Sequence, residues 1–392
     1  MKLVVLVVFF VLWGACGGEP EAPIVEPERP ATPRLGLWIL AEGSHRTLED
    51  RNKVDQLVED AARLRVTDLF VQVYRSGRSW FPSEHADAAP WQATRDADAD
   101  GDAPDGLHRL IAGAHARGMR VHAWFNALAL HRNRQAPLLR AVGRDAVLVD
   151  RQGRNLLDYP AFDVPQPDRL HVRLGTPGLY LDPATPGVIE YLERTVDDLV
   201  AAAPGLDGLH LDFIRHPLAL PIVPGSRFDG LDFGYGKPSI ARFEAETGQR
   251  MQRGQAWDDF RRERVQEMVD RLGARLPGHW ERSAAVLPWA VRAYLSAMQD
   301  WQRWLEDGSL DFAVAMLYTR DDRLLRYTAH SLAGGVGGER TWLGLGTWLF
   351  VRNPDRAVRQ VTLARTPAPT GLAYFSYDAL ASRPKAIEAL SR

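Results

Sequence analysis

Cysteine is nearly absent from this chain of 392 residues, in which Cys16 is the only one. A single cysteine cannot form an intramolecular disulfide, so folding must depend on the burial of apolar surface, for which the chain is long enough. Net charge is also close to absent, at −2. A nearly neutral chain gives no electrostatic reason to expect a nucleic-acid partner.

Long apolar runs are confined to the N-terminus. Met1–Trp13 contains one lysine followed by an unbroken apolar stretch, which is typical of a signal peptide and too short for a mature membrane-spanning helix. It leads into Trp13-Gly14-Ala15-Cys16, and small residues before a cysteine are similar to a bacterial lipobox. The motif predicts lipidation of Cys16 and attachment to a membrane. Because Trp13 stands where leucine is usual, cleavage by ordinary signal peptidase is the alternative.

Three segments follow from this pattern. Residues 1–15 are the predicted lipoprotein signal peptide, residues 16–34 a tether rich in proline and glutamate, and residues 35–392 a single folded domain. Gly17, and not aspartate, follows the cysteine, which under the usual sorting pattern implies the outer membrane. We therefore expect a lipid-anchored protein of the bacterial cell envelope that faces the periplasm.

The folded domain contains recurring apolar segments that are typical of strands. Amphipathic stretches such as 53–64, 107–117, 188–202, 257–272 and 356–364 lie between them. The predicted strands are Leu35–Leu40, Asp68–Tyr74, Arg120–Asn126, Gly208–Arg215, Ser283–Trp289, Asp311–Tyr318, Thr341–Trp348 and Gly371–Tyr377. Eight strands alternating with helices predict an α/β fold, the (β/α)8 or TIM barrel. A doubly wound sheet is the alternative, but no Gly-x-Gly-x-x-Gly turn follows a strand.

The fourth predicted strand ends in a group of polar side chains. Alternation puts Leu209, Leu211 and Phe213 on one buried face, and His210 and Asp212 on the opposite face. In a closed barrel that opposite face points into the core, where an unpaired carboxylate costs several kcal/mol. Asp212 therefore needs either partners or a function.

Motifs along the whole domain resemble one known family. They are Val71–Tyr74 with Trp80–Ser83, His122–Asn126, Leu181–Val188, the segment around Asp212, and Asp300–Trp304 leading to Leu310–Tyr318. In this order, across residues 35–380, they are similar to glycosyl hydrolase-like family 10. The resemblance implies a glycan-cleaving barrel of the bacterial envelope, in a family that includes an enzyme acting on peptidoglycan stripped of its stem peptides. It therefore implies a polysaccharide substrate, with the glycan strands of the cell wall as the expected example.

Cleavage of a glycosidic bond usually needs two carboxyl groups, one to protonate the leaving oxygen and one as nucleophile or base. Asp212 is the first candidate because it lies inside the barrel at a strand end, beside Arg215 and His216. Asp182 ranks next, although capping of the helix that begins near Pro183 would also explain it. The further candidates are Glu42, Asp321, Asp322 and Asp378.

Several positions depart from known glycosidase patterns. The predicted strands 283–289 and 341–348 carry no acid at ends where other barrel glycosidases have one. Ile214 stands where a chitinase-type motif has its acid, and Phe213 stands where many relatives have a second acid. These departures leave a second function class open, a barrel of the same fold that binds glycan without cutting it.

Aromatic side chains favour sugar binding independently of the family. Among the twelve tryptophans and the tyrosines, Trp80, Trp124, Trp289, Tyr318 and Trp348 lie at or just beyond predicted strand ends. Flat rings stack on the apolar faces of pyranoses, and polar side chains bind the hydroxyls. The predicted substrate-binding residues are Tyr74, Arg75, His122, Trp124, Asn126, His210, Arg215, His216, Trp289, Tyr318 and Trp348. Core packing is the alternative for each tryptophan, and helical spacing favours it for Trp301 and Trp304.

Two long connections and one acidic loop complete the sequence pattern. The loop 96–102 resembles the start of a calcium-binding EF-hand loop, but Leu107 occupies the place of the bidentate glutamate, so a solvated loop is the default. The histidines lack ligand spacing on one element, so we expect neither a metal site nor a cofactor.

Two long connections, 129–180 and 216–256, are expected to form two walls of a cleft suited to an extended polymer. The first contains a predicted hairpin at 147–157.

Overall fold

The structure, a computed structural model, describes residues 33–96, 104–222 and 231–391. The predicted signal peptide, Cys16, nearly all of the predicted tether and most of the acidic loop at 96–102 lie outside these residues. Within the described ranges, no helix combines the length and the apolar character needed to cross a membrane.

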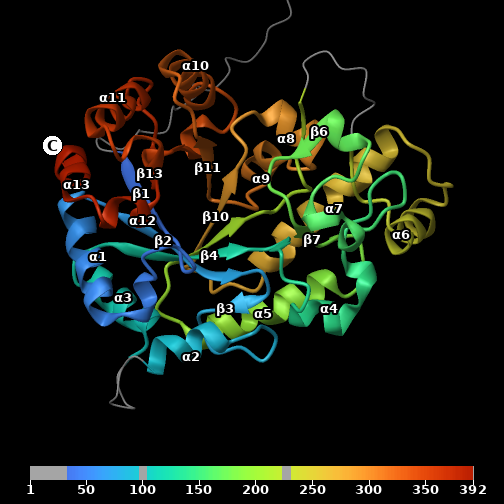
Figure 1. The fold of residues 1–392 in the computed structure, drawn as a ribbon, viewed down its shortest axis with the longest axis horizontal. Coiled ribbons are helices and arrows are strands. Elements are labelled where there is room, and N and C mark those ends of the chain that lie inside the picture. The colour runs from blue at the N-terminus through green and yellow to red at the C-terminus, as the bar shows by residue number, and fades with distance from the viewer. Residues whose placement is uncertain (1–32, 97–103, 223–230, 392) are drawn as a thin grey trace, which may run out of the picture.

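Eight parallel strands form a closed barrel at the centre of the molecule (Figure 1). In the order of the sheet they are β1 (Arg34–Ile39), β13 (Gly371–Phe375), β12 (Thr341–Leu345), β11 (Phe312–Leu317), β10 (Glu281–Val286), β8 (Gly208–Asp212), β4 (Arg120–Asn126) and β2 (Asp68–Arg75). Pairing of β1 with β2 closes the ring, and the short β3 (Arg78–Ser79) adds to β2 in antiparallel direction. The predicted (β/α)8 barrel is confirmed.

Helices surround the barrel, as Figure 1 shows. The longer ones are α1 (Arg51–Arg63), α3 (Gly106–His115), α5 (Val188–Ala202), α7 (Gln255–Gly273), α10 (Asp322–Ala333) and α11 (Pro354–Arg365). The shorter ones are α2 (Ala89–Asp96), α8 (Ala290–Ala297), α9 (Trp301–Glu306), α12 (Tyr377–Ala381) and α13 (Pro384–Ser391). In α1, Asp50 caps the N-terminus while Val54, Leu57 and Ala61 form a buried stripe, so the helix is fixed against the barrel along one face.

Alternation along each strand divides the apolar side chains into two cores. Leu37, Leu69 and Leu209 belong to the large core between strands and helices, which also contains the fully buried Trp301 and Trp304, as predicted. The barrel interior holds a separate core of Trp38, Phe70, Trp124, Ala285, Phe312, Val314, Trp342 and Ala373. The rings of Phe312 and Trp342 stack there with centroids 4.3 Å apart. The middle of the barrel is therefore filled, and we look for a substrate cavity at its ends.

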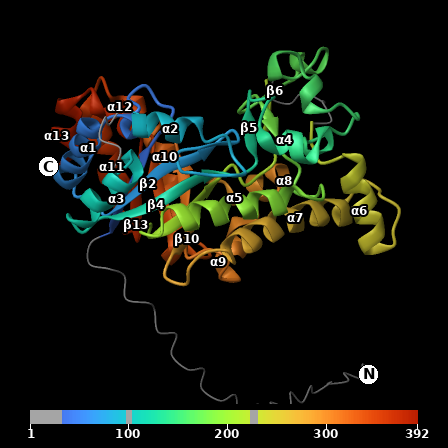
Figure 2. The ribbon, with the colours of Figure 1, turned by 90° about the horizontal axis from the view of Figure 1, so that it is seen from below.

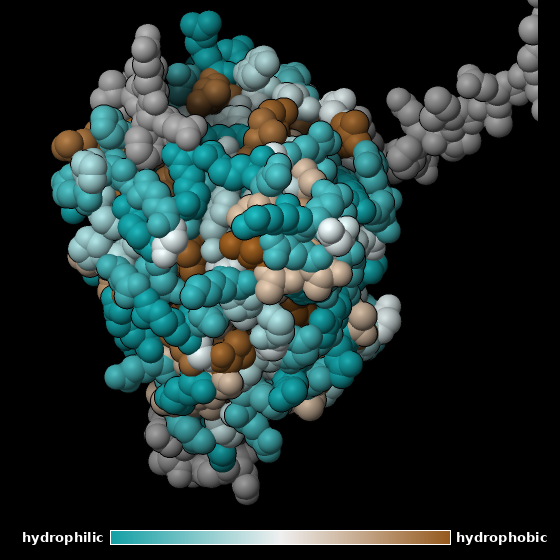
Figure 3. Space-filling model, turned by 90° about the vertical axis from the view of Figure 1, so that its right-hand side faces the viewer, coloured by the Kyte–Doolittle hydropathy of each residue, from teal (hydrophilic) through white to brown (hydrophobic). Residues whose placement is uncertain are grey.

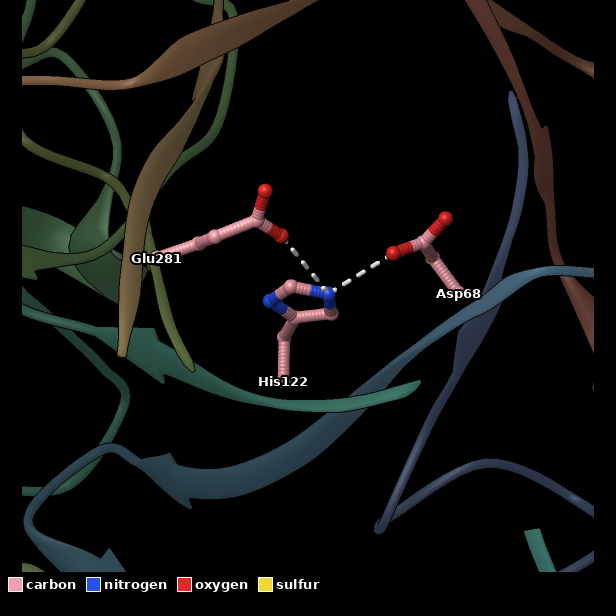
Figure 4. A group of neighbouring side chains, drawn as sticks. All are labelled: Asp68, His122 and Glu281. Atoms are coloured by element: carbon pink, nitrogen blue, oxygen red, sulfur yellow. Dashed lines mark hydrogen bonds and ion pairs between the residues drawn. The ribbon is translucent and has the colours of Figure 1, made fainter. Parts of the chain in front are cut away.

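An ion cluster closes the N-terminal end of the barrel (Figure 4). His122 Nε2 lies 2.9 Å from Asp68 Oδ1, and Arg34 donates from Nη1 to Glu281 Oε1 at 2.8 Å and from Nε to Asp68 Oδ2 at 3.1 Å. Burial opposes the charge on Asp68, but hydrogen bonds from His122 and Arg34 outweigh it and lower the pKa of this carboxyl well below its usual range. The cluster thus keeps an ionised carboxylate inside the barrel.

Two long connections leave the barrel and pack together. The one between β4 and α5 contains β5 (Ala129–His131), α4 (Pro137–Val142), β6 (Val172–Leu174) and β7 (Leu179–Tyr180), and the one after β8 contains β9 (Ala219–Pro221) and α6 (Lys237–Thr247). β6 pairs with β9, so the two connections form one wall beside the barrel and not the two separate walls that we expected (Figure 2). An antiparallel bridge between Val149 and Asn155 confirms the predicted hairpin at 147–157.

The side of the molecule that carries α6 in Figure 1 is shown in space-filling form in Figure 3. Its coloured surface is mostly hydrophilic, and hydrophobic residues occur there in small separate groups. Scattered apolar residues are normal on a solvated protein surface. This face therefore gives no reason to place the functional site outside the barrel.

Candidate active site

A cavity of about 360 Å³ opens at the C-terminal end of the barrel strands. Its lining includes inward-facing strand residues, namely Trp38, Gln72, Trp124, Asn126, Asp212, Ala285, Met316 and Phe375. Leu40, Arg75, His131, Thr176, Phe213, Arg215 and Tyr318 complete it from the strand ends and the loops. This end of a (β/α)8 barrel is where enzymes of this fold hold their catalytic groups.

Asp212 is the only carboxylate among the residues that line this cavity. Its side chain is buried, with Oδ2 accepting a hydrogen bond from Trp124 Nε1 at 3.1 Å and Oδ1 accepting one from the Phe213 N–H at 2.6 Å. Burial raises the pKa of Asp212 to about 6, although the Phe213 N–H, the charge of Arg215 and the Trp124 indole act in the opposite direction. Such a group can hold and release a proton near neutral pH.

Phe213 ends the strand in an unusual backbone conformation. Its φ of 52° lies in the left-handed region, which non-glycine residues rarely adopt and which occurs preferentially at functional sites. The turn brings the Phe213 N–H back onto Asp212 and turns the ring toward the cavity, beside the rings of His131 and Tyr180. Phe213 packs against the same outer core as Leu209 and Leu211, in line with the prediction, but it is only half-buried and also lines the cavity, because regular alternation stops at Asp212.

The rest of the cavity's charge is positive. Arg75 and Arg215 both line it, and Arg215 is only 7% exposed. His131 lies with them, and burial together with the charges of Arg75 and Arg215 lowers its pKa to about 4, so this imidazole is neutral at physiological pH. Within the described part of the chain, His131 Nε2, Arg75 Nε and the Tyr318 hydroxyl are buried without a hydrogen-bond partner.

A second hollow, of about 920 Å³, adjoins the first and shares Arg75 and His131 with it. Glu42 lies on its wall, where it accepts a hydrogen bond from Arg78 and lies 3.5 Å from Arg75 Nη1. The two guanidinium groups hold this carboxylate in place by charge-assisted contacts. The first hollow, lined mostly by apolar surface, holds Asp212, and the second, more polar hollow holds Glu42; the two meet at Arg75 and His131.

The other four candidates for a second carboxylate have structural partners elsewhere. Asp182 is buried and accepts hydrogen bonds from Ser239 Oγ at 2.7 Å and from the Ala184 N–H at 3.0 Å, so it joins its loop to α6. It does not cap α5, since Gly187 occupies that position. Asp378 accepts hydrogen bonds from backbone N–H groups after β1, Asp321 caps α10, and Asp322 pairs with Arg356 and Arg359. Of the five, only Glu42 lines one of the two hollows.

Comparison with protein families assigns the domain. The model of the family described as Glycosyl hydrolase-like 10 matches residues 34–330, which is most of the chain. The chain belongs to this family. The resemblance inferred from the motifs is thereby confirmed. Among curated proteins, the glycosyl hydrolase DigH of Escherichia coli (strain K12) is similar to this chain, with 25% identity over 80% of this chain and 74% of DigH.

Solved structures show that this member of Glycosyl hydrolase-like 10 shares its barrel with glycoside hydrolases. The glycoside hydrolase domain of PgaB (BpsB) from Bordetella bronchiseptica matches with a TM-score of 0.64 and 14% identity, over 92% of this chain and 98% of that domain. The catalytic domain of a β-amylase from Paenibacillus polymyxa matches with a TM-score of 0.54 and 10% identity, over 88% and 93%. The chain thus has a glycosidase-like fold.

The family's barrel brings together five of the predicted substrate-binding residues. Arg75, Trp124, Asn126, Arg215 and Tyr318 all line the cavity with Asp212. Because Trp124 is almost completely buried and bonds Asp212, its first role is to position that carboxyl group. The motif-based expectation of a site at the strand ends therefore agrees with the geometry for these residues.

Six other predicted substrate-binding residues lie outside the cavity lining. Tyr74 stacks on Phe125 in the outer core, and His216 is buried beside Arg261. His122 belongs to the ion cluster, and His210 is buried in the barrel interior, where it bonds Trp38 and Ser283. Trp289 and Trp348 are each 46% exposed. The positions of the four buried residues do not support contact with a substrate.

Trp348 lies near the rim of the cavity, unlike the buried residues. It belongs to a 3-10 helix, Thr347–Phe350, that follows β12. Trp348 and the cavity residue Tyr318 both pack close to Gly346. A β-carbon added to Gly346 would lie 3.3 Å from Trp348 Nε1 and 3.3 Å from Tyr318 Cδ1. An exposed indole next to a cavity wall can stack on a sugar ring that extends outward. Trp80, in contrast, is buried in the core.

Sequence reasoning missed several residues of the cavity. Gln72 and Trp38 follow the inward alternation of β2 and β1, and this signal was available in the sequence. His131 and Thr176 come from the long connection between β4 and α5, and the antiparallel pairing of β5 with β7 holds that connection in place. No local pattern predicts which loop residues turn back over a barrel.

Asp68, His122 and Glu281 also have the residue types of a metal site, with ligand atoms within 4.8 Å of one another (Figure 4). Arg34 already bonds both carboxylates, and Arg120 Nε lies 3.1 Å from Asp68 Oδ1. The two guanidinium groups supply the positive charge that a cation would bring. We therefore assign the cluster to stability and not to the candidate active site.

Proposed function

We propose that this protein is a glycoside hydrolase that cuts a polysaccharide at the C-terminal end of the barrel. The observation that carries the proposal is Asp212, a buried carboxyl group on the cavity wall, held by the Trp124 indole, with a pKa raised to about 6. A carboxylic acid with such a pKa can supply the proton that the leaving glycosidic oxygen requires near neutral pH.

Asp212 would act as the general acid. In its protonated form it donates to the glycosidic oxygen while the bond from that oxygen to the anomeric carbon breaks, and positive charge develops on the sugar ring. Trp124 fixes one carboxyl oxygen and the Phe213 N–H fixes the other, so the geometry of proton transfer is set before the substrate binds. The product of this step leaves Asp212 ionised, and Arg215 nearby favours that form.

Glu42 is our candidate for the second carboxylate. Arg75 and Arg78 hold it beside the hollow that continues from the cavity. As a general base it would deprotonate the attacking water, and as a nucleophile it would form a glycosyl-enzyme intermediate. The separation of the two carboxyl groups in the substrate complex determines which of these occurs, and with it inversion or retention at the anomeric carbon.

The expected substrate is a polymer of the bacterial envelope, and the glycan strands of peptidoglycan are the first candidate. Support comes from the two adjoining hollows, which suit several consecutive sugars better than one, and from membership of Glycosyl hydrolase-like 10. A lipid anchor on Cys16 would hold the enzyme at the outer membrane on the periplasmic side. This location rests on the motif Trp13-Gly14-Ala15-Cys16 alone.

A glycan-binding barrel without activity is the second candidate. It is favoured by one observation, that a single carboxylate lines the cavity among the described residues. Such a protein would use the same walls, with Trp348 and Tyr318 as sugar-stacking surfaces, but would leave the chain intact.

A reducing-end assay separates the two functions. Full-length protein is incubated with peptidoglycan freed from its stem peptides and with a panel of purified polysaccharides, and new reducing ends are counted. The matched control is Asp212→Asn, which keeps the size of the side chain but cannot donate the proton. New ends with the wild type and at least about a hundredfold fewer with the variant support hydrolysis. Binding by both proteins without new ends favours the binding barrel.

A further inference from the structure

Arg215 is a buried guanidinium group without a carboxylate partner at ion-pair distance among the described residues. It is 7% exposed, donates from Nη1 to the backbone oxygen of His216 at 3.3 Å, and lies beside the Tyr180 hydroxyl and over the ring of Phe213. Taking a charge out of water costs several kcal/mol unless an opposite charge compensates it. The side chain nevertheless lines the cavity at Asp212.

Nearby groups leave this positive charge in excess. Arg75 lines the same cavity, and its Nε is buried without a partner. Its carboxylate neighbour, Glu42, is shared with Arg78. Asp212 is the one acid among the residues that line the cavity, and one carboxylate cannot balance the two guanidinium groups there. His131 lines the same cavity and brings no negative charge; its pKa is lowered first by burial and then by the charges of Arg75 and Arg215.

We propose that Arg215, with Arg75 and His131 beside it, binds a carboxylate carried by the glycan next to the bond that is cut, so that the substrate is an acidic polysaccharide. This inference rests on the proposed function and specifies its substrate. A guanidinium group matches a carboxylate with two parallel N–H donors, and the match is strongest where water is excluded. The ligand would therefore complete a charge pair that the protein alone leaves open.

The surroundings of Arg215 also explain why its carboxylate partner would come from the ligand and not from the protein. An acid of the protein beside Arg215 would neutralise it permanently and would compete with Asp212 for the same charge. A carboxylate that arrives with the substrate pairs with Arg215 only in the complex. A neutral polysaccharide would cover the Arg215 guanidinium without supplying an opposite charge. It would therefore bind less tightly than an acidic one, and the site discriminates against it.

His131 offers a direct test that needs no catalysis. Glucuronate and glucose, which differ in one carboxylate, are titrated into the full-length protein, and the imidazole signals are followed by NMR, with His131→Gln to assign the resonance. We expect glucuronate to shift the His131 signal and to raise its pKa, because a bound anion stabilises the imidazolium, whereas glucose leaves the pKa unchanged. Equal behaviour of the two sugars overturns the proposal.

A polymer test identifies the residue. Stem-peptide-free peptidoglycan strands are compared with the same strands after their lactyl carboxylates have been converted to methylamides. Wild-type protein should bind the acidic strands at least about tenfold more tightly, and Arg215→Gln should bind both forms alike, with Arg215→Lys intermediate. Arg323→Gln, on the exposed face of α10, is the control. A preference that survives in Arg215→Gln overturns the assignment to Arg215.

The two proposals fail in different ways. If the protein cuts or binds only uncharged polysaccharides, the carboxylate site is refuted while the hydrolase is retained. If glucuronate raises the pKa of His131 but no polymer is cut, the anion site is retained and the hydrolase is refuted. Thermal unfolding of Arg215→Gln confirms that the variant is folded, and the comparison of glucuronate with glucose in the wild type does not depend on it.

Discussion

Trp124 and Asp212 lie on adjacent strands, and the indole Nε1 of the first donates to Oδ2 of the second at 3.1 Å. Both side chains point into the barrel, and both line the cavity. Because this bond lowers the pKa of Asp212 while burial raises it, the indole helps to keep the acid in a range useful near neutral pH.

Trp124→Phe should therefore move the pH dependence of the reaction. The ring remains buried but the donor is lost, so the pKa of Asp212 rises and the alkaline limb of the kcat/KM profile shifts to higher pH. Trp342→Phe is the matched control, since Trp342 lies in the barrel core and outside the cavity lining. An unchanged profile in Trp124→Phe would show that the hydrogen bond does not tune the acid.

Asp212→Asn should lose activity and gain stability. The rate should fall by at least about a hundredfold because the proton donor is gone. The folded-state pKa of Asp212 is raised, so its stabilising contribution is complete below the unfolded pKa of 3.8 and is lost as the pH rises through about 6.

Above pH 6 the wild type therefore keeps a buried charge that Asp212→Asn lacks. In urea unfolding at pH 7 to 8 the variant should be more stable by up to about 3 kcal/mol, and the difference should disappear near pH 4. Loss of stability at every pH, together with loss of activity, would mean that Asp212 is a structural residue.

Glu42→Gln and Asp182→Asn distinguish the two candidates for the second carboxylate. We expect at least about a hundredfold loss of kcat in Glu42→Gln, with unfolding close to that of the wild type because Gln keeps a hydrogen bond to Arg78. In Asp182→Asn we expect nearly normal kcat, since an amide can still bond Ser239 and the Ala184 N–H. The opposite result, an inactive and stable Asp182→Asn, would make Asp182 the second carboxylate.

Asp68→Ala should destabilise the fold without changing the chemistry. Removing Asp68 leaves His122 without its hydrogen-bond partner and Arg34 with Glu281 alone, and loss of one partner of a buried charge cluster costs about 3–5 kcal/mol. The pKa of Asp68 is lowered, so its contribution is present above the unfolded pKa and is lost as the pH falls toward the folded value. Asp55→Ala, which breaks a surface pair with Arg109, should cost no more than about 1 kcal/mol. Equal losses in the two variants would argue against a buried charge cluster.

Cys16→Ser tests the predicted anchor. If Cys16 is lipidated, the wild-type protein should partition into the detergent phase, and the variant should appear in the aqueous phase or as an unprocessed precursor. Cleavage by ordinary signal peptidase predicts that both proteins are aqueous and equally processed. Wild-type protein found wholly in the aqueous phase would rule out the lipobox.

The barrel could be predicted because apolar alternation repeats in every strand. β4 has the predicted bounds, Arg120–Asn126, and the predicted 188–202 helix is α5. The predicted fourth strand ran too far, to Arg215, because its apolar pattern continues through Phe213 and Ile214. The left-handed turn at Phe213 ends it at Asp212, and no composition rule signals such a turn at a phenylalanine.

The site could be predicted in part, for a related reason. Residues at the last inward position of a strand, Asn126 and Asp212, reach the cavity, whereas His122 and His210, earlier on the same strands, remain below it. Alternation gives the face of a side chain but not its depth in the barrel. Depth depends on strand tilt and register, which only the assembled fold determines.

Strand β4 contributes inward side chains at three depths of the barrel. Its inward residues are His122 in the ion cluster, Trp124 against the barrel core and Asp212, and Asn126 at the cavity. The ion cluster and the cavity use different residues at opposite ends of the barrel. Substitutions that line the cavity can therefore change substrate choice while the ion cluster stays intact. A library randomised at Asn126, Gln72 and Met316 should therefore retain folded proteins at high frequency. A one-residue insertion in β4 would instead shift its inward residues out of the ion cluster, the barrel core and the cavity at the same time.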